Sequence, residues 1–126
     1  MGKLVSTETI FLFVLFVLGE FFGNVFNLYR TLVAWDIVTH FVGGALVSSI
    51  VISFLHEYLK KYYYAVNVAI TLGVGAAWEI IEFLADKMFG LGLQPSLNDT
   101  MVDLIMVFSA AVIINLIFWY RKRGSK

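Results

Sequence analysis

The chain has 126 residues, of which 60% are hydrophobic, 17% are aromatic and only 14% are charged, and its formal net charge is zero. Soluble domains are about 45–50% apolar and about 25% charged, and a soluble domain this small could not bury so much apolar surface. The composition therefore excludes a soluble protein and predicts an integral membrane protein, while the absence of cysteine excludes disulfides, thiolate metal sites and cysteine nucleophiles.

Four apolar stretches have about the 20 residues that a helix needs to cross a bilayer. The first is too long for the apolar part of a signal peptide and lacks a clear small-residue cleavage site, so we expect an uncleaved helix. The third break contains two glycines and the only proline, which end one helix and delay the next. We predict an all-α fold, a single domain over residues 1–126, with transmembrane helices at about 9–29, 33–58, 63–89 and 99–120.

Charge is strongly segregated between the two ends of this predicted bundle. One end receives seven basic and two acidic residues, and the other receives two basic and seven acidic residues. The positive-inside rule then places both the N- and C-termini in the cytoplasm, with the chain crossing the inner or plasma membrane several times. The basic residues of the inner end are Lys3, Lys60, Lys61, Arg121, Lys122, Arg123 and Lys126.

Each predicted helix carries polar residues at helical spacing, always towards the outer end. Such spacing keeps each set on one face of its helix. Because lipid-facing positions rarely hold such residues, we expect the four faces to meet inside the bundle. In chain order the sets are Glu20, Asn24 and Asn27; Asp36 and His40; Glu79, Glu82 and Asp86; and Asp99 and Asp103.

Four isolated, ionised carboxylates within a membrane would cost roughly 10 kcal/mol or more, so a compensating group is required. Seven acids face one histidine and two basic residues at this end, which is too few for ion pairing. We therefore expect a site for a cation, either a divalent metal or protons, linked to transport or permeation. Its predicted ligands are Asp36, His40, Glu79, Glu82 and Asp103, supported by Glu20, Asn24, Asp86 and Asp99.

The identity of the cation stays open. One imidazole with several carboxylates suits Zn²⁺, Mn²⁺ or Fe²⁺, and carboxylates alone suit Ca²⁺ or Mg²⁺. A chain of carboxylates with a histidine is also typical of proton relays. Four helices are few for a transporter, so we expect a homo-oligomer surrounded by membrane lipids, and nothing indicates a nucleic-acid partner.

Several segments together resemble a known family. These are the stretch 35–41 followed by Gly43 and Gly44, the stretch 77–82, and then Asp86, Gln94, Asp99 and Asp103. They resemble the YjdF-like family of small prokaryotic inner-membrane proteins over about residues 33–111. The resemblance implies a membrane fold with a polar site and adds Gln94 to the supporting residues. It implies no substrate.

Two other function classes remain open. A metal-dependent enzyme acting on a lipid or isoprenoid could use Glu82 as a general base beside the metal. The sequence 98–103 also fits the N-D-x-x-x-D pattern of membrane prenyltransferases, although those have about twice as many helices. A non-catalytic accessory subunit could instead use its acids to bind a basic partner. No catalytic residue is assigned by the sequence.

Overall fold

The computed structural model describes residues 6–59 and 61–124, and within these ranges it contains helices and no strands. Four of the helices are long and apolar enough to cross a membrane, which confirms the predicted all-α bundle. Lys3, Lys60 and Lys126 lie outside the described residues, and the cytoplasmic location of the termini stays a prediction. The helices are α1 (Thr7–Val25), α2 (Leu28–Thr31), α3 (Val33–Tyr58), α4 (Tyr63–Phe89) and α5 (Leu97–Gly124).

The predicted bounds hold for α3 and α4, whereas the first predicted helix is divided in two. Its break falls at Asn27, whose φ of 54° is left-handed. Asparagine tolerates this conformation better than most residues, and the short α2 follows it. At the other end of the chain α5 begins at Leu97, two residues earlier than predicted. The cap is Ser96, whose hydroxyl accepts a hydrogen bond from the Asp99 amide at 3.2 Å.

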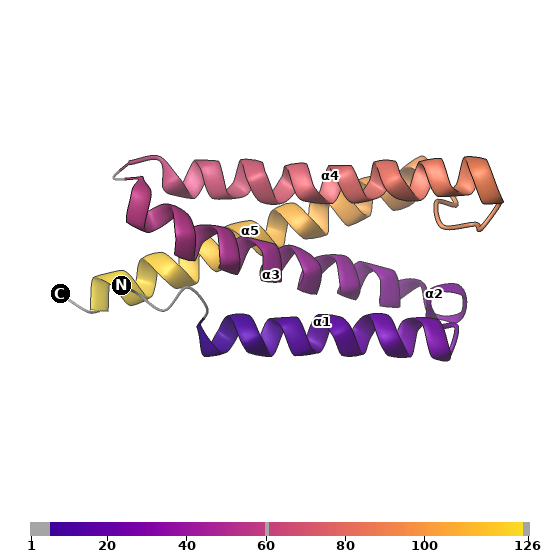
Figure 1. The fold of residues 1–126 in the computed structure, drawn as a ribbon, viewed down its shortest axis with the longest axis horizontal. Helices are drawn as coiled ribbons and strands as arrows, with labels where there is room; N and C mark the ends of the chain where they lie inside the picture. Colours follow the sequence, from indigo (N-terminus) through magenta and orange to yellow (C-terminus); the bar gives the residue numbers. More distant parts are fainter. Residues whose placement is uncertain (1–5, 60, 125–126) are drawn as a thin grey trace.

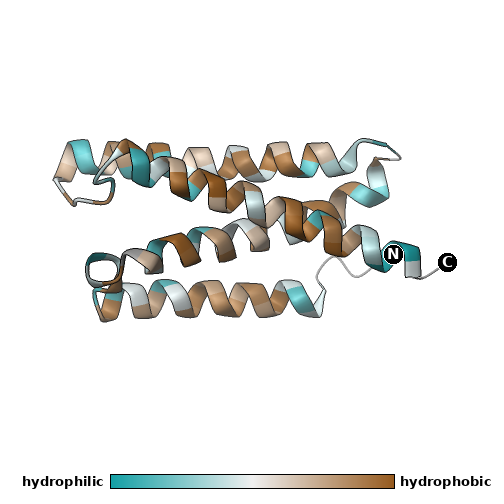
Figure 2. Cartoon of the chain, turned by 180° about the vertical axis from the view of Figure 1, so that it is seen from behind, coloured by the Kyte–Doolittle hydropathy of each residue, from teal (hydrophilic) through white to brown (hydrophobic). Residues whose placement is uncertain are grey.

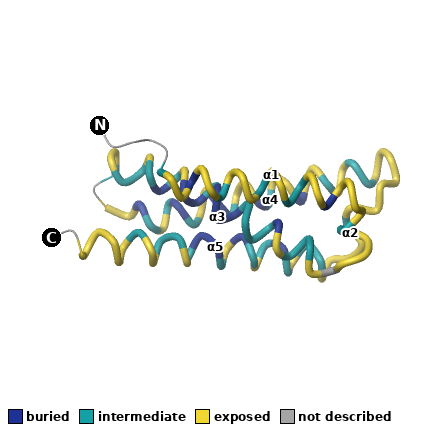
Figure 3. Tube along the Cα trace, turned by 90° about the horizontal axis from the view of Figure 1, so that it is seen from below, coloured by how far each residue is buried: buried dark blue, intermediate teal, exposed yellow. Residues whose placement is uncertain are grey.

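Helix α3 occupies the centre of the bundle and contacts α1, α4 and α5 (Figure 1). The backbone of helix α1 packs on α3 and α2, since in the described part of the chain no Cα of α1 lies within 8 Å of a Cα of α4 or α5. Figure 3 accordingly shows buried segments on α3, α4 and α5, while α1 is largely exposed. One wall of the bundle, between α1 and α4, is therefore not closed by helix packing.

Small residues let α3, α4 and α5 approach closely. A Cβ added to Gly44 would lie 2.9 Å from the Val107 Cα, and one added to Gly75 would lie 2.9 Å from a Val107 methyl group. Such close approach is the usual role of glycine between membrane helices. The first and third helices are joined differently, by a buried hydrogen bond of 2.7 Å between the Thr9 and Ser49 hydroxyls.

The two ends of the bundle differ in composition. Residues 6 and 124 lie at one end, here called the termini end, and α2 and the 90–96 connection lie at the other, here called the acidic end (Figure 1). Apolar residues dominate the middle of the helices and hydrophilic ones gather towards the two ends (Figure 2). The predicted polar faces all lie in the half that includes the acidic end, which is where we look for a site.

Candidate cation site

A histidine of α3 lies at the centre of a carboxylate cluster contributed by three helices. His40 Nε2 is 3.4 Å from Asp36 Oδ1, 3.6 Å from Glu79 Oε1 and 4.0 Å from Asp103 Oδ2. The side chains of His40, Glu79 and Asp103 are 8%, 5% and 3% exposed. Asp36 lies one helical turn before His40, so α3 itself supplies two of these groups. The predicted meeting of four polar faces is thus observed for α3, α4 and α5, whereas Asn24 and Asn27 of the first predicted helix are exposed.

The spacing of these atoms is suitable for a metal ion. Ligand atoms about 2.1 Å from a tetrahedral ion lie about 3.4 Å from one another, close to the three separations around His40. Two overlapping sets each offer three ligand atoms within 4.8 Å of one another. The sets are Asp36, His40 and Asp103, and His40, Glu79 and Glu82.

Glu79 has one oxygen held and the other free. Its Oε2 accepts a hydrogen bond of 2.6 Å from Gln94 Nε2, which also donates to the Glu79 carbonyl at 3.0 Å. Its Oε1 is buried and has no hydrogen-bond partner among the described residues. A buried carboxylate oxygen left without a donor is costly, and this one faces His40.

The 90–96 connection is shaped to deliver Gln94 to that carboxylate. Asp86 accepts hydrogen bonds of 2.7 Å from the backbone amides of both Leu93 and Gln94. Gly90 and Gly92 adopt positive φ of 65° and 68°, which glycine allows at no steric cost. Arg30 of α2 fixes the connection from the other side by donating to the Leu91 carbonyl at 3.2 Å. Asp86 therefore organises the backbone and lies apart from the cluster.

Two further acids are each held by an aromatic side chain. Tyr29 donates to Glu20 Oε1 at 2.7 Å, and Trp78 Nε1 donates to Glu82 Oε1 at 2.8 Å. Burial raises the pKa of the Tyr29 phenol, and the hydrogen bond to Glu20 raises it further. Tyr29 is therefore a stable proton donor that orients Glu20 without neutralising it.

Basic residues at the acidic end do not neutralise the cluster. Within the described ranges, no Lys or Arg nitrogen lies within 4 Å of a carboxylate oxygen of Asp36, Glu79, Glu82 or Asp103. Arg30 is directed to a backbone carbonyl, and Lys87 Nζ lies over the Phe83 ring, 5.6 Å from its centroid. The shortage of positive charge inferred from the sequence is therefore not relieved by the fold.

A cavity of about 760 Å³ adjoins the cluster and lies between α1, α3 and α4 under the 90–96 connection. Its acidic part includes Glu20, Asp36, Glu82 and Asp99, whereas Phe16, Leu46, Val47 and Val74 line a deeper apolar part. Glu79 and Asp103 are absent from its lining, so they lie behind His40, which does line it. The cluster thus has a buried rear and an accessible front.

Below the cavity a neutral polar network joins three helices. Asn67 of α4 donates from Nδ2 to Ser48 Oγ on α3 at 2.8 Å and to Asn115 Oδ1 on α5 at 2.7 Å. Asn115 in turn donates to the Tyr64 carbonyl at 3.0 Å. Ser48 and Asn67 are fully buried. This network therefore holds α3, α4 and α5 together on the side of the cavity towards the termini end.

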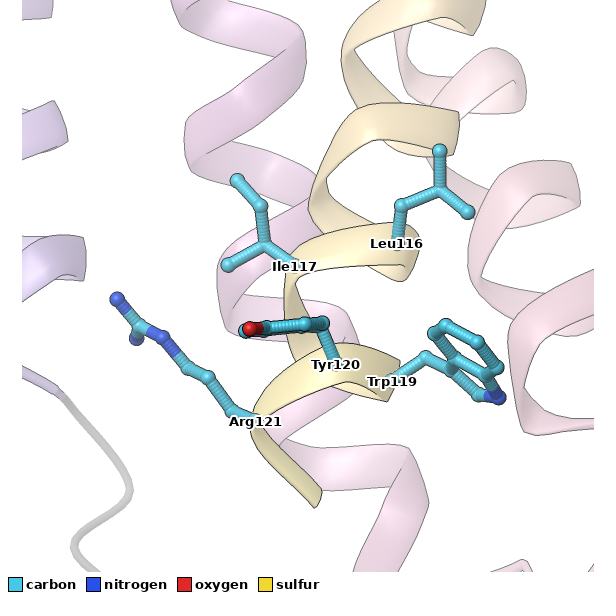
Figure 4. Close-up of a pocket in the computed structure, with 5 residues that line it drawn as sticks. All are labelled: Leu116, Ile117, Trp119, Tyr120 and Arg121. Atoms are coloured by element: carbon cyan, nitrogen blue, oxygen red, sulfur yellow. The ribbon is translucent and has the colours of Figure 1, made fainter. Parts of the chain in front are cut away.

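A second, smaller pocket of about 360 Å³ has a different character. All five of its lining residues belong to one stretch of α5 near the termini end and fan out from that helix (Figure 4). Arg121, the only charged member, is paired with Glu8 of α1 at 3.0 Å. With one helix as its wall and no acid in its lining, it offers no second cation site.

The predicted residues fall into three groups. Asp36, His40, Glu79, Glu82 and Asp103 come together, and Gln94 supports them directly. Glu20 and Asp99 line the cavity, as does Asn24, although the Asn24 amide donates to the carbonyl of Glu20 in its own helix. Asp86 acts through the connection. Two supporting contacts lie outside the predicted set. The i, i+4 spacing of Trp78 and Glu82 is a sequence signal for the first, whereas no sequence signal pairs Tyr29 with Glu20.

Comparison with known proteins agrees with a membrane fold. Residues 4–124 match the model of a family described as "Predicted membrane protein (DUF2238)". A Thermotoga maritima protein named "Uncharacterized protein" is 33% identical over 130 residues, an alignment that covers 97% of this chain and 64% of that protein. The chain thus spans less than two thirds of that relative's length. No solved structure matches. The chain belongs to the DUF2238 family of membrane proteins.

Proposed function

We propose that this DUF2238 membrane protein binds a divalent metal cation at the His40 cluster and that this binding serves movement of a cation into or across the membrane. The observation that carries the proposal is Glu79 Oε1, which is buried, lacks a hydrogen-bond partner among the described residues and lies 3.6 Å from His40 Nε2. A metal bound there would satisfy this oxygen and offset the charge of several carboxylates at once.

The donor set limits the choice of metal. Each of the two sets offers one imidazole nitrogen and two carboxylates, a donor set that favours Zn²⁺, Mn²⁺ or Fe²⁺ and suits a small coordination sphere. Mg²⁺ and Ca²⁺ prefer six or more oxygen ligands, whereas the His40 imidazole at the centre of both sets is a nitrogen ligand. Protons shared among the same groups are the alternative occupant.

The test is metal analysis of the full-length protein purified in detergent, with Mn²⁺ and Zn²⁺ added and then removed by gel filtration. Wild type is expected to retain about one ion per chain and to melt at a higher temperature with metal. His40→Ala should lose both effects. His56→Ala is the matched control, because His56 lies at the termini end and contacts the Ser53 carbonyl at 3.0 Å. Equal metal content in wild type and His40→Ala would refute the proposal.

A metal-dependent enzyme acting on a lipid or isoprenoid is the second candidate, and one observation favours it. Val74, Trp78 and Ile81 line the cavity while being 47%, 48% and 57% exposed, so the cavity opens sideways along the apolar helix α4. In this version Glu82 would act as general base beside the metal. Lipid turnover by purified protein with Mn²⁺ would support it, whereas metal flux into liposomes without turnover would support transport.

An accessory subunit that binds a basic partner is the least consistent with the fold. Counted over the whole residue, Glu79 and Asp103 are only 4% and 2% exposed, so a partner could not reach them without unpacking the bundle. We also propose that the chain resembles YjdF-like proteins and lies in the inner or plasma membrane with both termini in the cytoplasm. We propose further that it forms a homo-oligomer among membrane lipids. On this orientation the cation would enter the site from outside the cell.

A further inference from the structure

The cavity is much larger than a metal ion needs, and its shape is that of a site for a larger molecule. Its volume of about 760 Å³ lies within the range of sites for small organic ligands. An inorganic ion would be held by the His40 cluster alone. The deeper part, lined by Phe16, Leu46, Val47 and Val74, offers such an ion no ligand.

The cavity is deep as well as large. Thr71 lines it and lies 18 residues from the end of α4, about 27 Å along a helix of about 40 Å. Thr71 is 1% exposed and its Oγ1 has no hydrogen-bond partner among the described residues. The floor therefore holds a buried hydroxyl whose bonding capacity is unused, and only the Asn67 network lies below it.

The cavity opens to the side, where a membrane lies. Helices α1 and α4 form opposite walls and have no Cα atoms within 8 Å of each other. On the α4 wall, Val74, Trp78 and Ile81 form an edge at spacings of four and three residues, and each is about half exposed. An amphiphile dissolved in the bilayer could enter between these helices with its apolar part still in contact with lipid.

The polar part of the lining holds four acids, Glu20, Asp36, Glu82 and Asp99, against one arginine, Arg30, whose side chain donates to the Leu91 carbonyl. Glu20 on α1 and Glu82 on α4 face the cavity from opposite walls, each oriented by an aromatic neighbour, Tyr29 at 2.7 Å and Trp78 at 2.8 Å. Among the described residues Glu20 and Glu82 form no ion pair with Lys or Arg. An organic cation can be held between carboxylates and aromatic faces, which attract quaternary ammonium and similar groups.

We infer that this cavity binds an amphiphilic organic cation, which enters from the lipid between α1 and α4 and places its charge between the Glu20–Tyr29 and Glu82–Trp78 pairs. The inference extends the proposed function to a second class of cation. It rests on the cavity and needs no bound metal, although Glu82 belongs to both the cavity lining and the predicted metal ligands. The apolar groups of the organic cation would occupy the deeper part of the cavity, next to Thr71.

The experiment measures equilibrium binding of tetraphenylphosphonium to the full-length protein in detergent, with EDTA present. Tetraphenylborate, which carries the same four rings around a negative charge, is the matched control ligand. Wild type should bind the cation saturably, whereas tetraphenylborate, titrated separately because the two ions pair with each other, should not bind saturably. Glu20→Gln and Glu82→Gln should each weaken binding by about tenfold or more, and the double variant should abolish it.

The lateral route has its own pair of variants. Val74→Trp should obstruct the opening and weaken tetraphenylphosphonium binding, whereas Ile80→Trp should not, because Ile80 is 59% exposed on the same helix and does not line the cavity. Equal binding of tetraphenylborate, absence of saturable binding in wild type, or unchanged binding in the double glutamine variant would each overturn the inference. If the double variant fails to fold, the two ligands of opposite charge decide it on wild type.

The outcome is separable from that of the metal proposal. Tetraphenylphosphonium binding in EDTA, together with no retained metal in wild type, would remove the metal centre and leave this inference standing. Retained metal that depends on His40, together with no selective binding of the organic cation, would do the reverse.

Discussion

At the acidic end of the bundle the buried polar groups are charged and none of them is paired with Lys or Arg among the described residues, whereas towards the termini end they are neutral and several are hydrogen-bonded across helices. Glu79 Oε1 has no hydrogen-bond partner among the described residues, and Asp103 lies beside His40 and a second carboxylate, that of Asp36. Asn67, in contrast, joins Ser48 and Asn115 through two hydrogen bonds of its amide nitrogen, although its Oδ1 has no partner among the described residues. Both halves therefore bury polar atoms, but in the part of the chain that the structure describes only the half towards the termini end has hydrogen bonds that join the helices through them.

The difference indicates that the two ends of the bundle have different roles. A neutral network pays its desolvation cost with hydrogen bonds and so can stabilise helix packing. Carboxylates without partners cannot do this, and they persist in membrane proteins chiefly where an ion or substrate needs them. We therefore regard the Asn67 network as the structural half and the His40 cluster with its cavity as the functional half.

The largest effect is expected where the structural half is broken. Asn67→Leu removes the donor for Ser48 Oγ and Asn115 Oδ1, and the free energy of unfolding should fall by about 2–3 kcal/mol. Asn24→Leu is the control, because Asn24 is exposed and donates only to the Glu20 carbonyl of its own helix. Its effect should stay within about 0.5 kcal/mol. Unfolding in mixed micelles measures both, and equal stability of the two variants would contradict the division.

A smaller loss is expected at the junction of the halves. Gly44→Ala would place a Cβ 2.9 Å from the Val107 Cα, which is backbone and cannot rotate away. The resulting separation of α3 and α5 should cost about 1–2 kcal/mol. Gly73→Ala is the matched control, since a Cβ there meets nothing within 4 Å, and alanine in a helix is favoured over glycine by about 0.5–1 kcal/mol. Thermal unfolding of the two variants should shift in opposite directions; a shared direction would show that the contact is relaxed in solution.

The smallest effect on stability is expected in the functional half, where the main change is in metal affinity. Gln94→Ala removes the donor that holds Glu79 Oε2 at 2.6 Å, and Mn²⁺ affinity should fall about tenfold, as for other groups that orient metal ligands. Leu93→Ala keeps its backbone bond to Asp86 and should bind Mn²⁺ like wild type. Isothermal titration of both variants is the measurement. Unaltered affinity in Gln94→Ala would mean that Glu79 needs no such support.

Much of the site could be predicted from sequence because helical periodicity in a membrane is so restrictive. The spacing of Asp36 and His40, and of Glu79 and Glu82, placed each pair on one face, and the cost of charge in lipid turned those faces inward. The distinction between ligand and support was not accessible in this way. Asp86 has the same spacing as the others, yet its carboxylate is used by the Leu93 and Gln94 amides.

The break in the first predicted helix shows the other limit. The stretch 9–29 is apolar enough to continue, and hydropathy alone gives no stop at Val25. The left-handed Asn27 and the α2 turn direct Tyr29 back onto Glu20 over nine residues, a spacing that no single helix would bring together. Local propensity allowed this break, but packing against α3 selected it.

The sequence by itself determined that the chain crosses a membrane as four helices, and that its acids gather towards one end and face inward. Both follow from the cost of placing polar groups in hydrocarbon, which depends on composition and periodicity alone. Only the tertiary structure decided that α1 stands away from α4, leaving a cavity open to the side, with Glu79 and Asp103 behind its wall. These features depend on which helices touch, and that is settled by contacts such as those of Gly44 and Gly75 with Val107 rather than by any segment alone.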